Sequence, residues 1–465
     1  MKKDLLSWVA LVGLHTYLFY EQNPGINALI FSVAMLGAIF WAKPELWQHQ
    51  PWRWASTLHL LLAVSVAWHG EIRMPLYVLS LPLLVGLGFA PQSSLPVAGL
   101  NGGFAIFLVG LFNAIFTIRK HTTAQFQFFK NFKGSRYLLP AFITFVFYIM
   151  YSWINPAFSF DLLSFDWILD GALLFFIFLG ATWICPMFFP WGFEGLVRED
   201  EKLKNDLVFS ENINADRLKE ENQQGILSFG AVNILLVVFL LFNVFSSAAK
   251  TYSEQVHETF WALLLSIAAA IGLIMYFFRG HQNFYENKQR LFQMAVVWIV
   301  LNGLLIAWTF YRNTSYVAAF GLTYKRIAVY VGLLLSLIGL YLTYVKLKNL
   351  KSNVYLIRQN LWVVAGAVVL GCLIDWSRLI TWFNFNYADK VDVSYLLSLD
   401  KSNLPYLHQL VEKQDVRVKG FEDRIEGQVA AYKFEPSKET NWRELTYDHW
   451  RFQRFLKEAS IISTK

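Results

Sequence analysis

Long, nearly continuous apolar stretches recur along the 465-residue chain, from Leu5 almost to Asp375. Each approaches the roughly 20 residues that a helix needs to cross a hydrocarbon core about 30 Å thick. A spanning barrel would show alternating apolar and polar positions, and open strands would leave backbone groups unpaired in lipid. The pattern therefore predicts an all-α fold, a polytopic integral membrane helical bundle. The apolar stretches lie at 5–20, 25–42, 54–69, 74–90, 101–118, 137–154, 166–189, 226–247, 257–278, 291–311, 324–345 and 359–375.

The composition supports this class. With 56% hydrophobic, 17% aromatic and 16% charged residues, the chain is too apolar for a set of soluble domains. The net charge of +7 is explained by Lys and Arg in cytoplasmic loops, so we predict the lipid bilayer as a partner and no nucleic acid. Cys185 and Cys372 both lie within apolar stretches. We therefore expect no disulfide framework, no metal site and no cofactor.

The Lys and Arg of the loops predict the orientation. If all twelve stretches cross, the N-terminus is outside, with 18 of these residues in cytoplasmic loops and 8 outside. If one of the first five does not cross, the N-terminus is cytoplasmic and the balance becomes 21 to 5. We expect 101–118 not to cross, because it opens with NGG after a linker containing Pro91 and Pro96 and continues into a basic, aromatic segment. A re-entrant or in-plane helix near 101–118 fits these features and leaves eleven crossings.

The chain is expected to have four regions. Residues 1–189 form an N-terminal transmembrane region, whose opening MKKD we interpret as the start of a retained span because no small-residue cleavage site follows. Residues 190–225 form a cytoplasmic loop rich in both acidic and basic residues, either a solvated helical hairpin or a flexible loop. The alternative for this loop is a docking site for a cytoplasmic protein partner. Residues 226–382 form a C-terminal transmembrane region.

Residues 383–465 have the composition of a soluble module. The first part predicts two short helices interrupted at Asp400 to Pro405, and Asn441 is a suitable N-cap for a further helix. So small a helical tail would have a weak core alone. We expect it to lie on the extracytoplasmic side, against the membrane helices.

Few polar side chains fall at bilayer depth. His59 is the deepest histidine, and we favour a hydrogen-bonded neutral imidazole between helices over a metal ligand. Asn233, Asn243 and Asn302 are expected to bridge helices through hydrogen bonds.

The densest group of ionisable residues is predicted at the extracytoplasmic ends of the last four spans. This cluster would form either a ligand or ion site entered from outside, or an array of interhelix ion pairs that fixes the packing and holds the tail. We favour the second interpretation. The candidate ligand-binding residues are Glu254, His257, Glu258, Arg312, Lys325, Arg326, Asp375 and Arg378.

Enzyme motifs are incomplete in this sequence. His257 and Glu258 form half of the zinc-protease helix motif, but Trp261 stands where the second histidine should be. The chain also has no GxxxxGK[ST] or GxSxG stretch. We therefore do not predict an enzyme. A sensor, scaffold or envelope-associated factor is favoured, with a transporter or channel for a small polar solute or ion as the alternative.

Several of these segments also carry a family likeness. Together, YSEQVHETFWALL, FGLTYKRIAVY, NVYLIRQN, DWSRLITWFNF and DVSYLLSLDKSNLP resemble the bacterial polytopic membrane family catalogued as domain of unknown function 4173, with its sister 4153, in a Bacteroidetes-like branch. The likeness covers residues 190–410 well and the first 190 residues by hydropathy. It implies a protein of the bacterial inner membrane with a many-helix core and a short extracytoplasmic tail. It implies no activity and no site residues.

Overall fold

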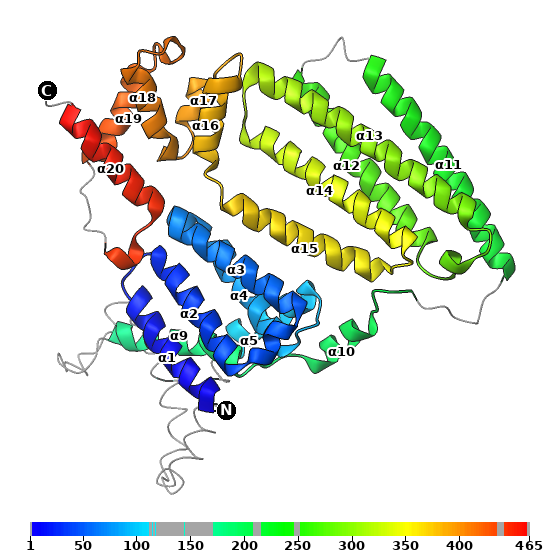
Figure 1. Cartoon of the computed structure of the whole chain (residues 1–465), viewed down its shortest axis with the longest axis horizontal. Helices are drawn as coiled ribbons and strands as arrows, with labels where there is room; N and C mark the ends of the chain where they lie inside the picture. Colours follow the sequence, from blue (N-terminus) through cyan, green and yellow to red (C-terminus); the bar gives the residue numbers. More distant parts are fainter. Residues whose placement is uncertain are drawn as a thin grey trace, which may run out of the picture. The chain divides into compact units, whose positions relative to one another are not determined.

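The fold is given by a computed structural model, which contains helices and no strand within the residues that it describes (Figure 1). These residues divide into two compact units. Unit 1 comprises Met1–Glu201 and Ser437–Arg451, and unit 2 comprises Lys202–Pro436 and Phe452–Lys465. The described residues are 2–110, 171–207, 215–245, 252–434 and 441–462, together with Ala114, Thr117 and Thr144.

Unit 1 is a bundle of apolar helices. Helix α2 packs against both α1 and α3, and α9 lies along α1, where Trp8 Nε1 donates a hydrogen bond to Ala181 O at 3.0 Å. The first four helices coincide with the first four predicted spans. The helices of this unit are α1 (Lys2–Phe19), α2 (Ile26–Ala42), α3 (Gln50–His69), α4 (Met74–Phe89), α5 (Leu95–Phe107), α9 (Gly171–Phe188) and α10 (Glu194–Lys202).

Helices α4 and α5 pack closely against each other in unit 1. A Cβ atom added at Gly102 would lie 1.8 Å from Pro82 O, and one added at Gly86 would lie 1.9 Å from Ala98 O. Only glycine permits so close an approach of two backbones, which is the packing mode of small residues in membrane helices. Of the two glycines that suggested an irregular segment, Gly102 is therefore a contact residue of this helix pair, whereas Gly103 makes no such contact.

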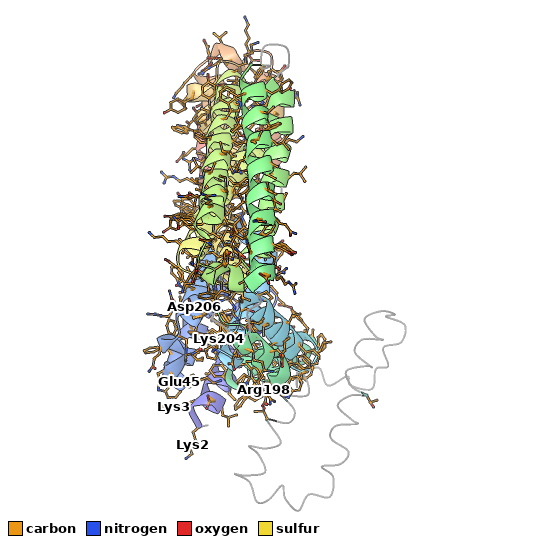
Figure 2. All side chains as sticks on the ribbon, turned by 90° about the vertical axis from the view of Figure 1, so that its right-hand side faces the viewer. Lys2, Lys3, Glu45, Arg198, Lys204 and Asp206 are labelled. Atoms are coloured by element: carbon orange, nitrogen blue, oxygen red, sulfur yellow. The ribbon has the colours of Figure 1, made fainter. Side chains whose placement is uncertain are left out.

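One end of unit 1 carries basic residues. Lys2 and Lys3 lie there, together with the acidic Glu45 (Figure 2). Lys43, just beyond α2, donates a hydrogen bond from Nζ to Met187 O in α9 at 3.3 Å. Burial lowers the pKa of Lys43, although the nearby carboxylates of Asp4 and Glu45 oppose that shift. Helix α10 follows α9 at this end of the unit. Asp200 of α10 accepts a hydrogen bond from Ser94 N at 2.7 Å, so the α4–α5 turn lies at this end as well.

The other end of unit 1 binds a segment from near the C-terminus. Ile26 N, at the start of α2, donates to Leu445 O at 3.0 Å, and Asn23 N donates to the Glu444 carboxylate at 3.0 Å. At the end of α3, His69 Nδ1 donates to the Asp448 carboxylate at 2.6 Å. Residues far apart in sequence therefore complete this end of the bundle.

Unit 2 is built on five long helices. Helix α13 packs against α11, α12 and α14, and α14 packs against α15 (Figure 1). Its apolar core includes Phe229 of α11, Ile274 of α12, Trp298 of α13 and Leu333 of α14. The helices are α11 (Ala215–Phe245), α12 (Tyr252–Phe277), α13 (Gln289–Phe320), α14 (Tyr324–Lys348) and α15 (Asn353–Cys372).

A cluster of short helices follows α15 and shares a core with the ends of α13 and α14. Val317 and Leu322 lie in the same apolar cluster as Leu396, Leu407 and Ile425. The boundary between the two units falls inside α20, after Arg451. The elements of this cluster are α16 (Trp376–Tyr387), α17 (Val393–Leu397), η5 (Lys401–Asn403), α18 (Leu404–Glu412), η6 (Val416–Val418), α19 (Glu422–Phe434) and the second part of α20 (Tyr447–Ile462), whereas η7 (Trp442–Glu444) belongs to unit 1.

Membrane-spanning capacity agrees with the predicted class. By length and composition, six apolar stretches within the described residues are able to cross a membrane, and the first of them contains both α3 and α4. This is therefore a membrane protein with several spans. The number of eleven crossings stays a prediction. Apart from Thr144, the predicted stretch 137–154 lies outside the described residues. The six are Gln50–Phe89, Gly171–Phe188, Asp216–Phe242, Gln289–Phe320, Tyr324–Lys348 and Asn353–Cys372.

Two boundaries differ from expectation. Helix α5 begins at Leu95 instead of residue 101, because Pro96, assigned to a linker, occupies the first turn, where its missing N–H costs no hydrogen bond. Asn441 caps the short helix η7 through Arg443 N, while the long helix starts only at Tyr447. The two short helices around Asp400 to Pro405 are confirmed as α17 and α18.

The predicted interhelix hydrogen bonds are confirmed for three side chains. His59 Nδ1 of α3 lies 2.7 Å from Ser80 Oγ of α4. Asn233 Nδ2 of α11 donates to Met294 O of α13 at 3.0 Å, and Asn302 accepts from Ser266 of α12 at 3.2 Å. The side chain of Asn243 lies outside the described residues.

Candidate functional site

The turn between α13 and α14 is held by α16. Asn384 of α16 accepts a hydrogen bond from Leu322 N through Oδ1 and donates one to Leu322 O through Nδ2 at 3.0 Å. The preceding residue, Gly321, has φ +76, and a Cβ atom there would lie 2.7 Å from the Asn384 side chain. Glycine is required at this position both for the left-handed backbone and for the space.

Arg326 belongs to the same turn. Its guanidinium donates to Phe320 O at 2.8 Å and to Gly321 O, and it lies 3.8 Å from the centroid of the Tyr316 ring. The last carbonyls of a helix attract a cation, so Arg326 stabilises the end of α13. Thr323 caps the start of α14 by accepting from Arg326 N.

Asp375 connects the membrane helices to the tail. It caps α16 by accepting a hydrogen bond from Arg378 N at 3.1 Å, and it also accepts one from the Ser402 hydroxyl at 2.8 Å. Asn403, the neighbour of Ser402, donates to Thr381 Oγ1 at 2.9 Å and to Leu396 O at 2.8 Å. Helix α16 is therefore joined by polar contacts to the helices that follow it.

The other predicted residues are placed differently. Arg312 is buried on α13, with its guanidinium 5.0 Å from the Trp308 ring centroid. Lys325 and Arg378 have exposed side chains. The three remaining candidates lie in the first turns of α12, and their side chains are outside the described part of the structure. They are Glu254, His257 and Glu258.

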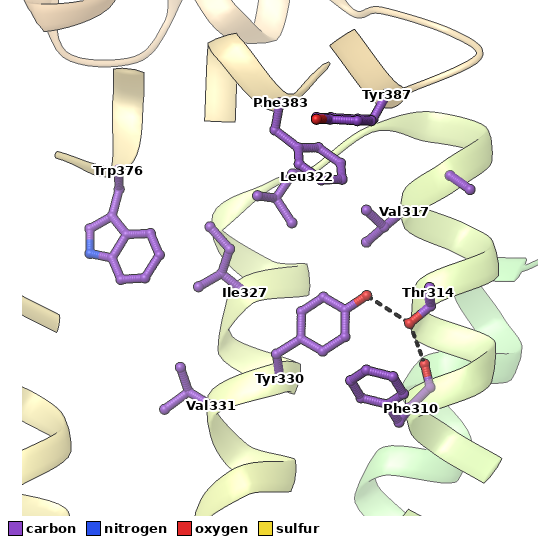
Figure 3. A pocket seen from close by; sticks show the side chains of 11 residues that line it. Phe310, Thr314, Val317, Leu322, Ile327, Tyr330, Val331, Trp376, Phe383 and Tyr387 are labelled. Atoms are coloured by element: carbon purple, nitrogen blue, oxygen red, sulfur yellow. Dashed lines mark hydrogen bonds between the residues drawn. The ribbon is translucent and has the colours of Figure 1, made fainter. Parts of the chain in front are cut away.

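A groove opens beside this junction. It has a volume of about 670 Å³, and it lies between the end of α13, the start of α14 and one face of α16 (Figure 3). Few polar side-chain atoms line the groove. Thr314 Oγ1 and Tyr330 OH are 3.0 Å apart, and the Thr314 hydroxyl donates a hydrogen bond to Phe310 O at 2.8 Å. Apolar and aromatic side chains form most of the lining, as in pockets for apolar ligands. The lining residues are Phe310, Thr314, Val317, Ala318, Leu322, Ile327, Tyr330, Val331, Trp376, Phe383 and Tyr387.

The groove was not predicted from the sequence. Ile327, Tyr330 and Val331 recur at helical spacing on one face of α14, which is a visible signal for a contact face. However, the groove needs a face from each of three helices, and their pairing is a tertiary property. No predicted site residue with a described side chain lines it.

The predicted cytoplasmic loop contacts the helices at both of its ends. In unit 1, Asn101 of α5 accepts a hydrogen bond from Phe193 N at 2.7 Å. In unit 2, Ser352 N, at the turn between α14 and α15, donates to Asn205 O at 2.8 Å, and Arg358 donates to the Asn205 side chain at 3.0 Å. Helix α11 already begins at Ala215, within the predicted loop.

Comparison with known proteins identifies the family and no activity. The model of the family described as "Domain of unknown function (DUF4153)" matches residues 8–410, which include the helices of both units and the tail as far as α18. No curated protein and no solved structure matches the chain. The resemblance named 4173 first, and the match instead selects its sister. The chain is a multi-span membrane protein that belongs to the DUF4153 family.

Proposed function

We propose that this protein is an envelope-associated sensor or scaffold of the bacterial inner membrane, with a cytoplasmic N-terminus and an extracytoplasmic tail. The contacts within unit 1 support this orientation. Ser94 N binds Asp200, and Lys43 binds Met187 O, so the loops around 43 and 94 share an end with α10. If all twelve stretches crossed, these loops would lie on the opposite side from α10. The basic residues gathered at this end then favour the cytoplasm.

The observation that carries the sensor proposal is the shared lining of the groove. Tyr330 lies on a membrane helix and Trp376 on α16, so one occupant would contact both at once. Asn384 joins α16 to the α13–α14 turn, and Asp375 joins it to Ser402. A change in the groove would therefore reach the tail through bonded elements.

We assign an acyl chain of an outer-leaflet lipid to this groove. Helices α13 and α14 are both apolar and long enough to span a bilayer, and the groove lies over the end of one and the start of the other. Below it, the exposed face of α14 stays apolar through Leu334, Leu337 and Tyr341. Trp376 and Tyr387 are suited to the membrane interface. The groove is thus continuous with the surface that lipid covers.

Photo-crosslinking tests this assignment. The protein is reconstituted in nanodiscs with a phospholipid that carries a diazirine on one acyl chain, and lipid adducts are mapped by mass spectrometry. We expect adducts on Tyr330 and Trp376. Ala318→Phe should fill the groove and reduce them several-fold, whereas Ala319→Phe, beside the groove, should leave them unchanged.

Hydrogen exchange of the tail separates the two parts of the proposal. A sensor requires Ala318→Phe, but not Ala319→Phe, to change the exchange of residues 392–412. Adducts without that change would leave a lipid site but reject sensing through the tail. Equal adduct yields in both variants would reject the lipid assignment.

The transporter alternative rests on other residues. The described side chains of Arg326 and Asp375 cap helix ends and hold the tail, which supports a scaffold more than an ion site at that end. Transport is favoured instead by polar side chains buried between α2, α3 and α4, at bilayer depth, among them His59. Uptake measurements with reconstituted protein and His59→Gln would test this second candidate.

A further inference from the structure

Polar side chains from three helices meet inside unit 1. Ser32 lies on α2, His59 on α3, and Tyr77 and Ser80 on α4; all four are buried, and His59 is 0% exposed. The surrounding helices are apolar. Buried polar atoms in such an environment need hydrogen-bond partners, because they are removed from bulk solvent.

The number of protons on each hydroxyl determines the direction of each hydrogen bond. Ser80 has a single hydroxyl proton, and it donates that proton to Tyr77 O at 2.6 Å. Ser80 Oγ is also 2.7 Å from His59 Nδ1, so in this pair Ser80 accepts and His59 Nδ1–H donates. Ser32 likewise donates to Ala28 O at 2.7 Å, which makes Tyr77 OH the donor in its 3.0 Å contact with Ser32.

This direction determines the tautomer of His59. A neutral imidazole with its proton on Nδ1 has a lone pair on Nε2, which can only accept. Among the described residues, His59 Nε2 has no hydrogen-bond partner, and neither has the Ser56 hydroxyl, three residues earlier on the same face of α3. Ser56 is 1% exposed. Two buried polar groups one helical turn apart on α3, one of them an obligatory acceptor, therefore have no hydrogen-bond partner among the described residues.

We propose that His59 Nε2 and the Ser56 hydroxyl bind a water molecule inside the helical bundle of unit 1. The water donates one hydrogen bond to Nε2 and shares another with Ser56, so that both groups are satisfied. Trp52 continues the same face of α3 toward its start, and its buried Nε1 also has no partner within the described part of the chain. The polar row of α3 thus extends from the water site toward the basic end of unit 1.

Nitrogen NMR of the protein in lipid nanodiscs tests the proposal. With histidine and asparagine both ¹⁵N-labelled, the signals of His59 are assigned as those that disappear in His59→Gln. We expect the proton on Nδ1 and an Nε2 signal shifted by a hydrogen bond. We also expect polarisation to pass from water protons to Nε2 at least several-fold faster than to the Nδ2 amide of Asn27, which is equally buried but bonded to Leu18 O and Asn23 O.

Two outcomes would overturn the proposal. A proton on Nε2 would contradict the assigned tautomer, and transfer from water as slow as for Asn27 would mean a dry site. Ser80→Ala gives a further check on the same signals. It removes the acceptor of Nδ1–H, so the tautomers should become mixed, whereas Ser93→Ala, whose hydroxyl bonds locally to Ala90 O, should leave the His59 signals unchanged.

Discussion

Asn384 satisfies both main-chain polar groups of Leu322, one through its amide oxygen and the other through its amide nitrogen. Both residues are buried, so neither group has water as a substitute. This pairing joins the turn between two membrane helices to the first helix of the tail. Its amide chemistry is specific, because no other side chain of that size both donates and accepts in this geometry.

Asn384→Asp should destabilise unit 2. Aspartate can still accept from Leu322 N, but it leaves Leu322 O without a donor and adds a buried charge. We expect a loss of about 1–3 kcal/mol, seen as a lower midpoint of thermal unfolding in detergent. Asn386→Asp is the control, since Asn386 lies on the same helix with an exposed side chain. Equal midpoints for the two variants would contradict this role.

Gly102→Ala should prevent α4 and α5 from packing. The new methyl group would overlap the carbonyl of Pro82, and backbone atoms cannot move aside as a flexible side chain can. We expect low yield and aggregation on size-exclusion chromatography. The neighbouring Gly103→Ala places its methyl in open space and should behave like the unsubstituted protein. Monodisperse Gly102→Ala protein would show that this contact is looser than described.

The pairing of Asp415 with Arg417 predicts a weak dependence of stability on pH. Hydrogen bonds from Arg417 lower the pKa of Asp415 to about 2 from its ordinary 3.8. The pair therefore contributes fully above pH 3.8, and its contribution is lost as the pH falls toward about 2. In Asp415→Asn, this part of the acid dependence should disappear. Because Arg417 is nearly half exposed, the effect should be small. Unfolding midpoints measured from pH 5 to pH 2 would check it, and unchanged acid dependence in Asp415→Asn would contradict it.

Cysteine labelling should place residues 92 and 198 on the same side of the membrane. The two native cysteines are buried, so a Gln92→Cys or Arg198→Cys protein offers one accessible thiol. We expect both to react with a membrane-impermeant maleimide only after the cells are opened, because both lie at the basic end of unit 1. A cysteine replacing Lys413, in the tail, should react in intact spheroplasts. Labelling of residue 92 but not 198 from outside would support twelve crossings.

Much of the helical plan follows from the hydrophobic pattern alone. Apolar stretches longer than a bilayer is thick have few alternatives to a helix, and the isolated polar residues inside them, such as His59 and Asn233, need partners on a neighbouring helix. These features depend on local sequence and on the solvent. They could therefore be predicted without knowledge of the fold.

The candidate site could not be predicted in the same way. Arg326 and Asp375 attract notice as charges, but their roles depend on a carbonyl of Gly321 and a hydroxyl of Ser402, which only the fold brings to them. The groove has no charged lining residue and no sequence motif. Its residues become recognisable only once three helix faces are known to meet.

The contact of Leu445 and Glu444 with the turn before α2 has a consequence for biosynthesis. Helices α1 and α2 leave the ribosome early, yet the residues that cover their turn are translated more than four hundred positions later. Until then, Gly25 and Ile26 keep an uncovered backbone, since Leu445 O and Glu444 O normally lie against them. A nascent or prematurely terminated polypeptide would thus carry an unfinished N-terminal bundle, which quality-control proteases could recognise.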